Sequence, residues 1–218
     1  MLHENLVRVA LAAPLNSSVR PLLGAVLEVY NQIMTYLETY EQSVAQLRGC
    51  TIRAVRYLDV PTNDGTSPWE SASFDVLHGG IELDTDRPGT VALIWDGRNP
   101  DYGIAVTHHS VVEAFTTELT VWDVTATSRW ASYLGVPITD TTVTWIYPQF
   151  RPDQVPATPL TIELTFANNT RMYIVYGGYQ EGDQHGTVAD ALTVVFDDEV
   201  ARKRHIGRYM PVEYRYRP

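Results

Sequence analysis

The residues of this chain best placed for chemistry lie in a glycine-rich stretch, residues 178–186. Glu181, Asp183 and His185 alternate there, so in an extended backbone their side chains point to the same side. Two carboxylates and an imidazole on one side are suited to binding a cation or to acting as a general base. The stretch lacks the carboxylate that a calcium-binding loop carries at its twelfth position, and a solvated hairpin loop explains it equally well. We therefore name these three residues as metal-site candidates but predict no metal centre.

The remaining histidines show no metal-ligand spacing. His108 and His109 are neighbours in a predicted strand and therefore point to opposite faces. A site that joins His78, His108 or His109 with Asp101 stays an alternative. The chain lacks a Gly-x-Ser-x-Gly nucleophile motif, a phosphate-binding loop and a dinucleotide fingerprint. Its one cysteine, Cys50, stands between two apolar segments, which indicates a buried structural thiol. From these patterns we expect no catalytic residue and no cofactor.

Charge is distributed unevenly along the chain. Of a net charge of −10, residues 1–200 contribute −15, from 10 basic and 25 acidic residues, and residues 201–218 contribute +5. An acidic body argues against nucleic acid as a ligand, because phosphates need Lys and Arg. It favours either plain solubility or a surface for a basic protein partner. The candidate residues for such a surface are Asp84, Asp86, Asp96 and Asp101.

The strongest periodic pattern predicts a long helix over residues 20–48. Ser17 or Ser18 offers an N-cap before it, and Gly49 a stop after it. Within it, apolar residues recur at alternating spacings of three and four, which makes a heptad seam. The seam residues are Leu23, Val26, Tyr30, Ile33, Leu37, Tyr40, Val44 and Leu47. Two interpretations stay open: the helix lies across a sheet of its own chain, or residues 23–47 form a coiled-coil or dimer helix.

After Cys50 the pattern changes to strands and turns. The clearest hairpin covers residues 160–176, with apolar and polar residues alternating before a turn at Asn168-Asn169. For residues 73–84 the pattern predicts either a pair of strands or one strand with a bulge at Gly79-Gly80. Every strand connection except that between Val124 and Val143 is too short for a helical crossover, which argues against a parallel doubly wound sheet. We predict an α+β fold in which the long N-terminal helix packs on a mainly antiparallel, curved sheet or open barrel.

The length of 218 residues fits a single domain, residues 1–218. We expect a leader strand or loop over 1–19, the helix over 20–48, the antiparallel β region over 51–197, and a short helix with a basic tail over 198–218. No apolar run is long enough to span a membrane, and the first residues do not form a signal peptide pattern. A cytoplasmic location is therefore expected.

The second half of the chain has an order of segments that resembles a known group of proteins. A Trp-containing segment ending in Leu-Gly (residues 128–135) leads to an aromatic strand, the 160–176 hairpin, and Ala-Asp-Ala-Leu-Thr-Val-Val-Phe-Asp at 189–197. This order resembles small acidic bacterial proteins that look like immunity proteins of polymorphic-toxin systems. The resemblance covers about residues 70–200 and implies a protein-binding function without shared catalytic residues. The long helix and the basic tail lie outside it.

Three functions follow as expectations. The first is a non-catalytic binding protein, of the immunity type, that neutralises a bacterial toxin by covering its basic active site. The second is a structural or assembly subunit that self-associates through residues 23–47. The third is a metal-dependent enzyme that uses the loop 181–185.

Overall fold

A computed structural model describes residues 19–60, 69, 71, 73–95, 103–112, 119–146, 157–178 and 188–215. The chain divides between Thr39 and Tyr40 into two units, and each is described by itself. All but the last residue of the predicted leader (1–19) lies outside the described residues. The single domain expected from the sequence stays a prediction.

The helix α2 runs from Val19 to Ala45 and is followed by a turn over residues 46–49. Gly49 has a φ of +78°, a left-handed conformation that favours glycine, and its N–H donates to the carbonyl of Ile138 at 2.7 Å. Val44 and Leu47 are buried in the main hydrophobic core. The last turn of α2 therefore belongs to the packed interior of the second unit.

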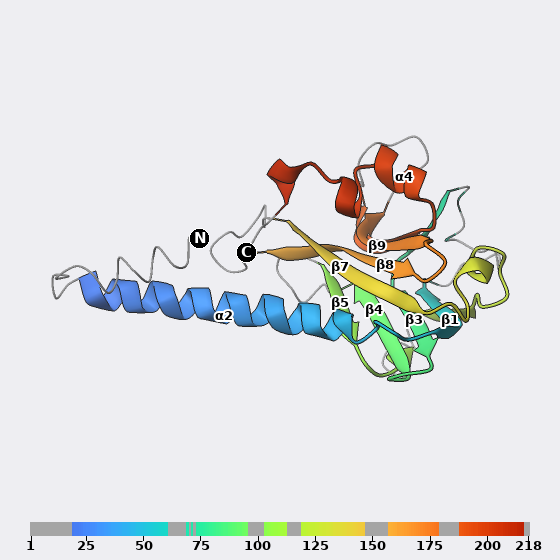
Figure 1. Ribbon diagram of the computed structural model, residues 1–218, viewed down its shortest axis with the longest axis horizontal. Coiled ribbons are helices and arrows are strands. Elements are labelled where there is room, and N and C mark those ends of the chain that lie inside the picture. The colour runs from blue at the N-terminus through green and yellow to red at the C-terminus, as the bar shows by residue number, and fades with distance from the viewer. Residues whose placement is uncertain are drawn as a thin grey trace. The chain divides into compact units, whose positions relative to one another are not determined.

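Ten strands of the described chain form two five-stranded sheets in that unit (Figure 1). The first sheet has the order β5-β4-β3-β1-β6. Its strands are β1 (Ile52–Asp59), β3 (Gly80–Thr85), β4 (Thr90–Trp95), β5 (Ile104–Thr107) and β6 (Thr120–Asp123). The second sheet has the order β2-β10-β9-β8-β7. Its strands are β2 (Phe74–Leu77), β7 (Ile138–Ile146), β8 (Thr158–Phe166), β9 (Arg171–Gly178) and β10 (Val188–Val195).

Every strand pair is antiparallel, so the predicted mixed helix-and-antiparallel-sheet class is confirmed. The prediction of one curved sheet or open barrel is wrong, because the strands form two separate sheets. The chain changes sheet at residues 78–79, between β2 and β3, where the sequence allowed a single bulged strand. Alternation of apolar residues shows that a strand has a buried face, but not which strands share its sheet.

The main core lies between the two sheets. Val55 and Tyr57 of β1 belong to the same buried cluster as Ile162 of β8 and Ile174 of β9. Trp130 is fully buried in this cluster and lies in a short 3-10 helix, η1 (Trp130–Ser132). Sheet-on-sheet packing of this kind fixes the facing side chains in one arrangement.

The outer face of the second sheet is covered by the C-terminal segment, residues 197–215. This segment contains α4 (Asp198–Lys203) and the 3-10 turns η2 (Gly207–Tyr209) and η3 (Val212–Tyr214). Ile206 and Ala201 pack with Tyr173 and Val175 of β9 in a second buried cluster. Gly207 has a φ of +56°, and a Cβ at this position would approach the Tyr173 ring to 3.1 Å. No helix among the described residues is long and apolar enough to cross a membrane.

Candidate functional site

Two of the four acidic residues predicted to bind a basic partner, Asp84 and Asp86, are described, and both accept hydrogen bonds from their own chain. Asp84 Oδ1 accepts hydrogen bonds from the Arg56 guanidinium at 3.0 Å and from the Thr90 hydroxyl at 2.5 Å. Asp86 Oδ1 accepts from the N–H of Thr51 at 2.7 Å, and this bond holds the pKa of Asp86 below its usual value. The other two candidates, Asp96 and Asp101, lie outside the described residues.

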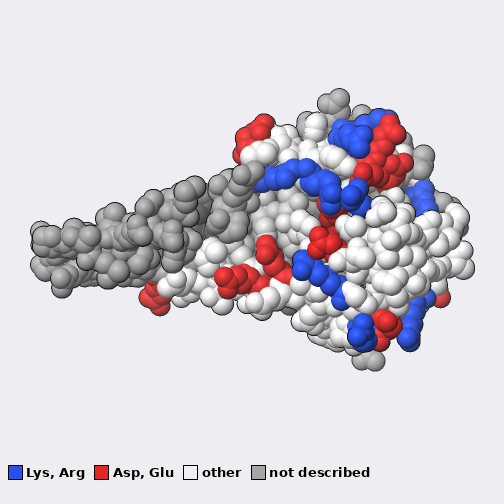
Figure 2. Space-filling view, in the orientation of Figure 1, with Lys and Arg blue, Asp and Glu red and all other residues white. Residues whose placement is uncertain are grey.

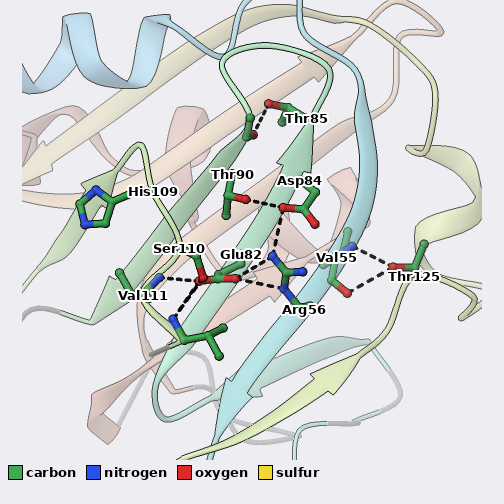
Figure 3. Close-up of polar contacts among 12 residues, drawn as sticks. Val55, Arg56, Glu82, Asp84, Thr85, Thr90, His109, Ser110, Val111 and Thr125 are labelled. Carbon is green, nitrogen blue, oxygen red and sulfur yellow. Dashed lines mark hydrogen bonds and ion pairs between the residues drawn. The ribbon is translucent and has the colours of Figure 1, made fainter. Parts of the chain in front are cut away.

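A buried glutamate lies beside Asp84 on the outer face of the first sheet (Figure 3). Glu82 is fully buried, and its Oε2 accepts from Nε of Arg56 at 3.0 Å. Its Oε1 accepts from the Ser110 hydroxyl at 2.8 Å and from the backbone N–H groups of Val111 at 2.7 Å and Val112 at 3.3 Å. Both carboxylate oxygens therefore accept hydrogen bonds from the surrounding chain, and Glu82 acts as an anchor.

The anchored segment closes a small apolar cluster on the same face. Val111 packs there with Leu58, Ala92 and Ile94, all of which are buried. Glu82 therefore fixes residues 110–112 over the sheet, and the Arg56 charge balances the buried carboxylate.

An aspartate–histidine pair marks the point where the chain passes between the sheets. Asp59 is fully buried, and its Oδ1 accepts from Nδ1 of His78 at 3.0 Å, from the His78 N–H at 3.1 Å and from the Val60 N–H at 2.8 Å. Such a pairing orients the imidazole ring of a general base in many enzymes. Here two of the three hydrogen bonds come from backbone N–H groups, those of Val60 and His78. The primary role of Asp59 is therefore to hold these two backbone segments together.

A third buried carboxylate links the two sheets. Asp75 of β2 accepts from the Tyr57 hydroxyl of β1 at 2.7 Å and from the Arg129 guanidinium at 2.5 Å. The Tyr57 oxygen in turn accepts from Nε1 of Trp130 at 3.0 Å. Burial, with Asp75 nearby, raises the pKa of Tyr57 well above its usual value. The phenol is therefore protonated at neutral pH, where it stabilises the junction.

The basic C-terminal segment folds back onto a fourth buried carboxylate. Arg208 donates from Nε to Oε2 of Glu163 at 3.1 Å and from a second nitrogen to Oε1. Arg171 lies 3.6 Å from the same carboxylate and 3.3 Å from Asp198 of α4. Burial alone would raise the pKa of Asp198, but hydrogen bonds from two tyrosine hydroxyls and the charge of Arg171 bring it below its usual value.

The other described basic residues of this segment also have partners within it or beneath it. Arg202 lies over the ring of Tyr209, Arg204 lies over the ring of Phe74, and Lys203 pairs with Glu199 at 2.9 Å. The contrast between a −15 body and a +5 tail is therefore partly an internal balance. A basic partner would meet the net −10 of the whole chain, and both signs lie interspersed on the face drawn in Figure 2.

These contacts give a physical reason for a chain in which fifteen of the sixteen basic residues are arginines. Arg56 and Arg129 each use two guanidinium nitrogens to bind oxygen atoms of two different residues, and Arg208 uses two to bind both oxygens of one carboxylate. The planar fork of arginine makes such paired bonds, whereas the lysine ammonium is a single point of charge.

Of the predicted histidine and loop sites, the structure describes only the histidines His78, His108 and His109. His108 contacts the Ser43 hydroxyl through Nε2 at 2.8 Å, whereas His109 is exposed. Among the described residues, no three His, Cys, Asp or Glu side chains lie close enough to hold a metal ion. Glu181, Asp183 and His185 lie outside the described residues, so the metal-site hypothesis stays a prediction.

The last turns of α2 are held against the edges of both sheets. The Tyr40 hydroxyl donates to the carbonyl of Ile104 in β5 at 2.6 Å, and Nε1 of Trp145 in β7 donates to Glu41 at 2.9 Å. The Tyr40 and Trp145 rings also pack edge to face, with centroids 5.1 Å apart. These contacts fix the part of α2 that belongs to the second unit, from Tyr40 onward.

Sequence reasoning missed all four buried carboxylates, although they share one pattern. Each stands in a strand or at its end between two apolar neighbours, where alternation reads a polar residue as solvent-facing. The four segments are Leu58-Asp59-Val60, Phe74-Asp75-Val76, Ile81-Glu82-Leu83 and Ile162-Glu163-Leu164. The excess of arginine over lysine is the one sequence feature that could have suggested buried partners for these acids, and the sequence alone gave no account of it.

We compared the chain with protein-family models, with characterised proteins and with solved structures, and none of the three comparisons gave a match.

Proposed function

We propose that this chain is a non-catalytic assembly subunit that joins other protein subunits through the N-terminal part of α2. The observation that carries the proposal is the two-sided character of that helix. Its charged, amide and threonine side chains from residue 28 to residue 42 are all exposed, namely Glu28, Asn31, Gln32, Thr35, Glu38, Thr39, Glu41 and Gln42. Its remaining positions from residue 22 to residue 37 are all apolar in sequence.

The buried charges of the second unit also favour a non-catalytic role. Four buried carboxylates are held by arginine, histidine and backbone donors, so the acid groups of the body hold the fold together. Val44 and Leu47, the last two residues of the heptad seam, are buried in the core of their own chain. The seam residues Leu23, Val26 and Tyr30 precede that region, and an apolar face that long is unstable in water unless something covers it.

A native-extract experiment tests this function. Tagged chain is produced at low level, and the extract is fractionated by size under non-denaturing conditions. We expect wild type to elute in a complex larger than one chain, and Ile33→Lys to elute as one chain. Thr35→Lys adds the same charge to an exposed neighbouring position and serves as the matched control. Elution of wild type as a single chain would remove the proposal. Fractionation of the same cells tests the predicted cytoplasmic location.

Toxin neutralisation is a second proposal, favoured by the net charge of −10. Its partner surface must lie outside the Asp84 and Asp86 contacts, because both carboxylates are occupied by their own chain. The test is survival of cells that produce a toxin encoded beside this chain. Survival that depends on Asp96 and Asp101, with Asp140→Asn as the exposed control, supports this second function, and death of the co-producing cells rejects it.

A further inference from the structure

Five tryptophan and tyrosine rings of the second unit lie in an unbroken row through its core. The ring centroids of Trp122 and Trp69 are 4.8 Å apart, and those of Trp69 and Tyr57 are 5.7 Å apart. Tyr57 lies 6.3 Å from Trp130, and Trp130 lies 6.2 Å from Tyr133. We call these five residues the aromatic path. Each step is a direct edge-to-face contact, so an electron can pass from ring to ring without crossing another group.

The path begins near solvent and continues into the interior. Indole and phenol rings give up one electron to a strong one-electron oxidant far more readily than phenylalanine rings do. Trp122 lies on the edge strand β6 and is half-buried, whereas the other four rings are at most 7% exposed. An oxidant in solvent therefore meets the path at Trp122.

Tyr57 differs from the other rings because its proton has a place to go. Its hydroxyl donates to Oδ2 of Asp75 at 2.7 Å, and Asp75 is 3% exposed. Loss of an electron makes a phenol strongly acidic, so the proton leaves together with the electron when a base is in contact. The phenol oxygen also accepts from Nε1 of Trp130 at 3.0 Å, which keeps it in position after its proton has gone.

The charges around Asp75 remain balanced after such a transfer. Arg129 binds the other carboxylate oxygen, Oδ1, at 2.5 Å and also donates to the carbonyl of Ser71. When the phenol proton moves to Oδ2, Asp75 becomes neutral and the tyrosyl radical is neutral as well. The one charge that remains is that of Arg129, whose side chain is 22% exposed and so reaches solvent. No unpaired charge is left on a fully buried group.

We propose that the core of the second unit is a one-electron relay in which Tyr57 holds the radical. A one-electron oxidant, of the class of oxidised metal complexes, takes an electron from Trp122. Trp69 replaces that electron, and Tyr57 then replaces the electron of Trp69. In the last step the phenol O–H bond breaks, its electron passes to Trp69 and its proton to Asp75. A one-electron donor acting at Trp122 reverses both transfers.

Photo-oxidation of the full chain tests the relay. Asp123→Cys places a thiol at an exposed position beside Trp122, and a ruthenium polypyridyl complex is attached to it. Cys50→Ala removes the other thiol of the chain. A light flash with a sacrificial electron acceptor oxidises the ruthenium, and the radical that follows is frozen and identified by electron paramagnetic resonance. We expect a tyrosyl signal that forms more slowly in D2O, because a proton moves with the electron.

Three variants of the labelled chain locate the radical and its route. Tyr57→Phe should lose the tyrosyl signal and show a tryptophanyl signal in its place. Trp122→Phe interrupts the path at its surface end and should lower the tyrosyl yield several-fold. Trp145→Phe is the matched control, since it replaces a buried tryptophan that is not part of the path, and it should keep the yield of the labelled parent.

Urea unfolding first shows that each variant is folded. If Tyr57→Phe does not fold, the comparison of Trp122→Phe with Trp145→Phe decides, because both leave the hydrogen bonds of Tyr57 in place. The relay is overturned by a labelled parent without a tyrosyl signal, by a tyrosyl signal that persists in folded Tyr57→Phe, or by equal yields in the two tryptophan variants.

Discussion

Arg208 binds both carboxylate oxygens of Glu163, a side chain only 2% exposed, and so joins the basic end of the chain to the outer face of the second sheet. The pair shows that part of the positive charge near the C-terminus is balanced within the chain. The segment that carries Arg208 is part of the fold, and its cation neutralises an acid that would be costly to bury alone.

Replacement of Arg208 by lysine tests this link. Lysine keeps the charge but loses the two-point fork, so we expect the free energy of unfolding in urea to fall by about 1–3 kcal/mol. Backbone amides of residues 198–209 should exchange faster with solvent. Lys203→Gln removes an exposed cation of the same segment and should change stability by less than about 0.5 kcal/mol. Equal effects of the two variants would show that the fork is not needed.

Glu82→Gln should be more damaging. The amide keeps the shape of the side chain but turns an NH2 group toward groups that are themselves donors, so we expect a loss of about 3–5 kcal/mol. The control is Asp140→Asn, which breaks the Arg48–Asp140 pair, where the side chains are 52% and 57% exposed. A surface pair of this kind contributes at most about 1 kcal/mol. Urea unfolding of both variants measures the difference, and similar losses would contradict an anchoring role for Glu82.

Tyr57→Phe should weaken the junction between the sheets. Loss of the hydroxyl leaves Nε1 of Trp130 buried without its acceptor and removes one donor from Asp75, which costs about 1–3 kcal/mol. Tyr214→Phe removes a hydroxyl from a residue that is 64% exposed, and thermal unfolding should not distinguish it from wild type. If Tyr57→Phe also unfolds like wild type, the buried hydroxyl adds nothing to stability.

The fold should lose stability at alkaline pH. Burial raises the pKa of Tyr133 to about 12, and the pKa values of Tyr57 and Tyr173 are also raised, in each case first because of burial. A raised pKa means that folding favours the protonated phenol, so this contribution is complete below pH 10 and is lost as the pH rises. For Tyr133 the loss falls between pH 10 and about 12. Tyr133→Phe should be less stable at neutral pH, yet show a shallower decline over that interval. An unchanged slope would contradict the role of burial.

Local sequence pattern predicted local structure well. The hairpin expected over residues 160–176 is present as β8 and β9, and Asn169 adopts the positive φ, 62°, that its turn requires. The same reasoning failed for pairings between distant strands. β2 pairs with β10, more than a hundred residues away, and no alternation within Phe74–Leu77 encodes that choice. One sheet was therefore expected where two exist.

The candidate site was predictable only on the helix. The spacing of Leu23 to Leu47 is visible in the sequence because helical periodicity is a local property. The contacts of Glu82 and Glu163 were not, because each depends on an arginine brought close by the tertiary fold, Arg56 in one case and Arg208 in the other. We predicted that Asp84 and Asp86 bind a partner protein, because the sequence shows which residues are charged. It does not show which groups of the same chain bind those charges in the fold.

The most direct test of the central claim is the light-scattering mass of purified chain, measured over a range of concentrations. If the apolar face of α2 joins copies of the chain, wild type and the exposed-face control Thr35→Lys will have a mass several times 24.5 kDa. Ile33→Lys will then have the mass of one chain with an unchanged tryptophan spectrum. A wild-type mass of 24.5 kDa at every concentration, or an Ile33→Lys mass equal to that of wild type, would contradict the claim.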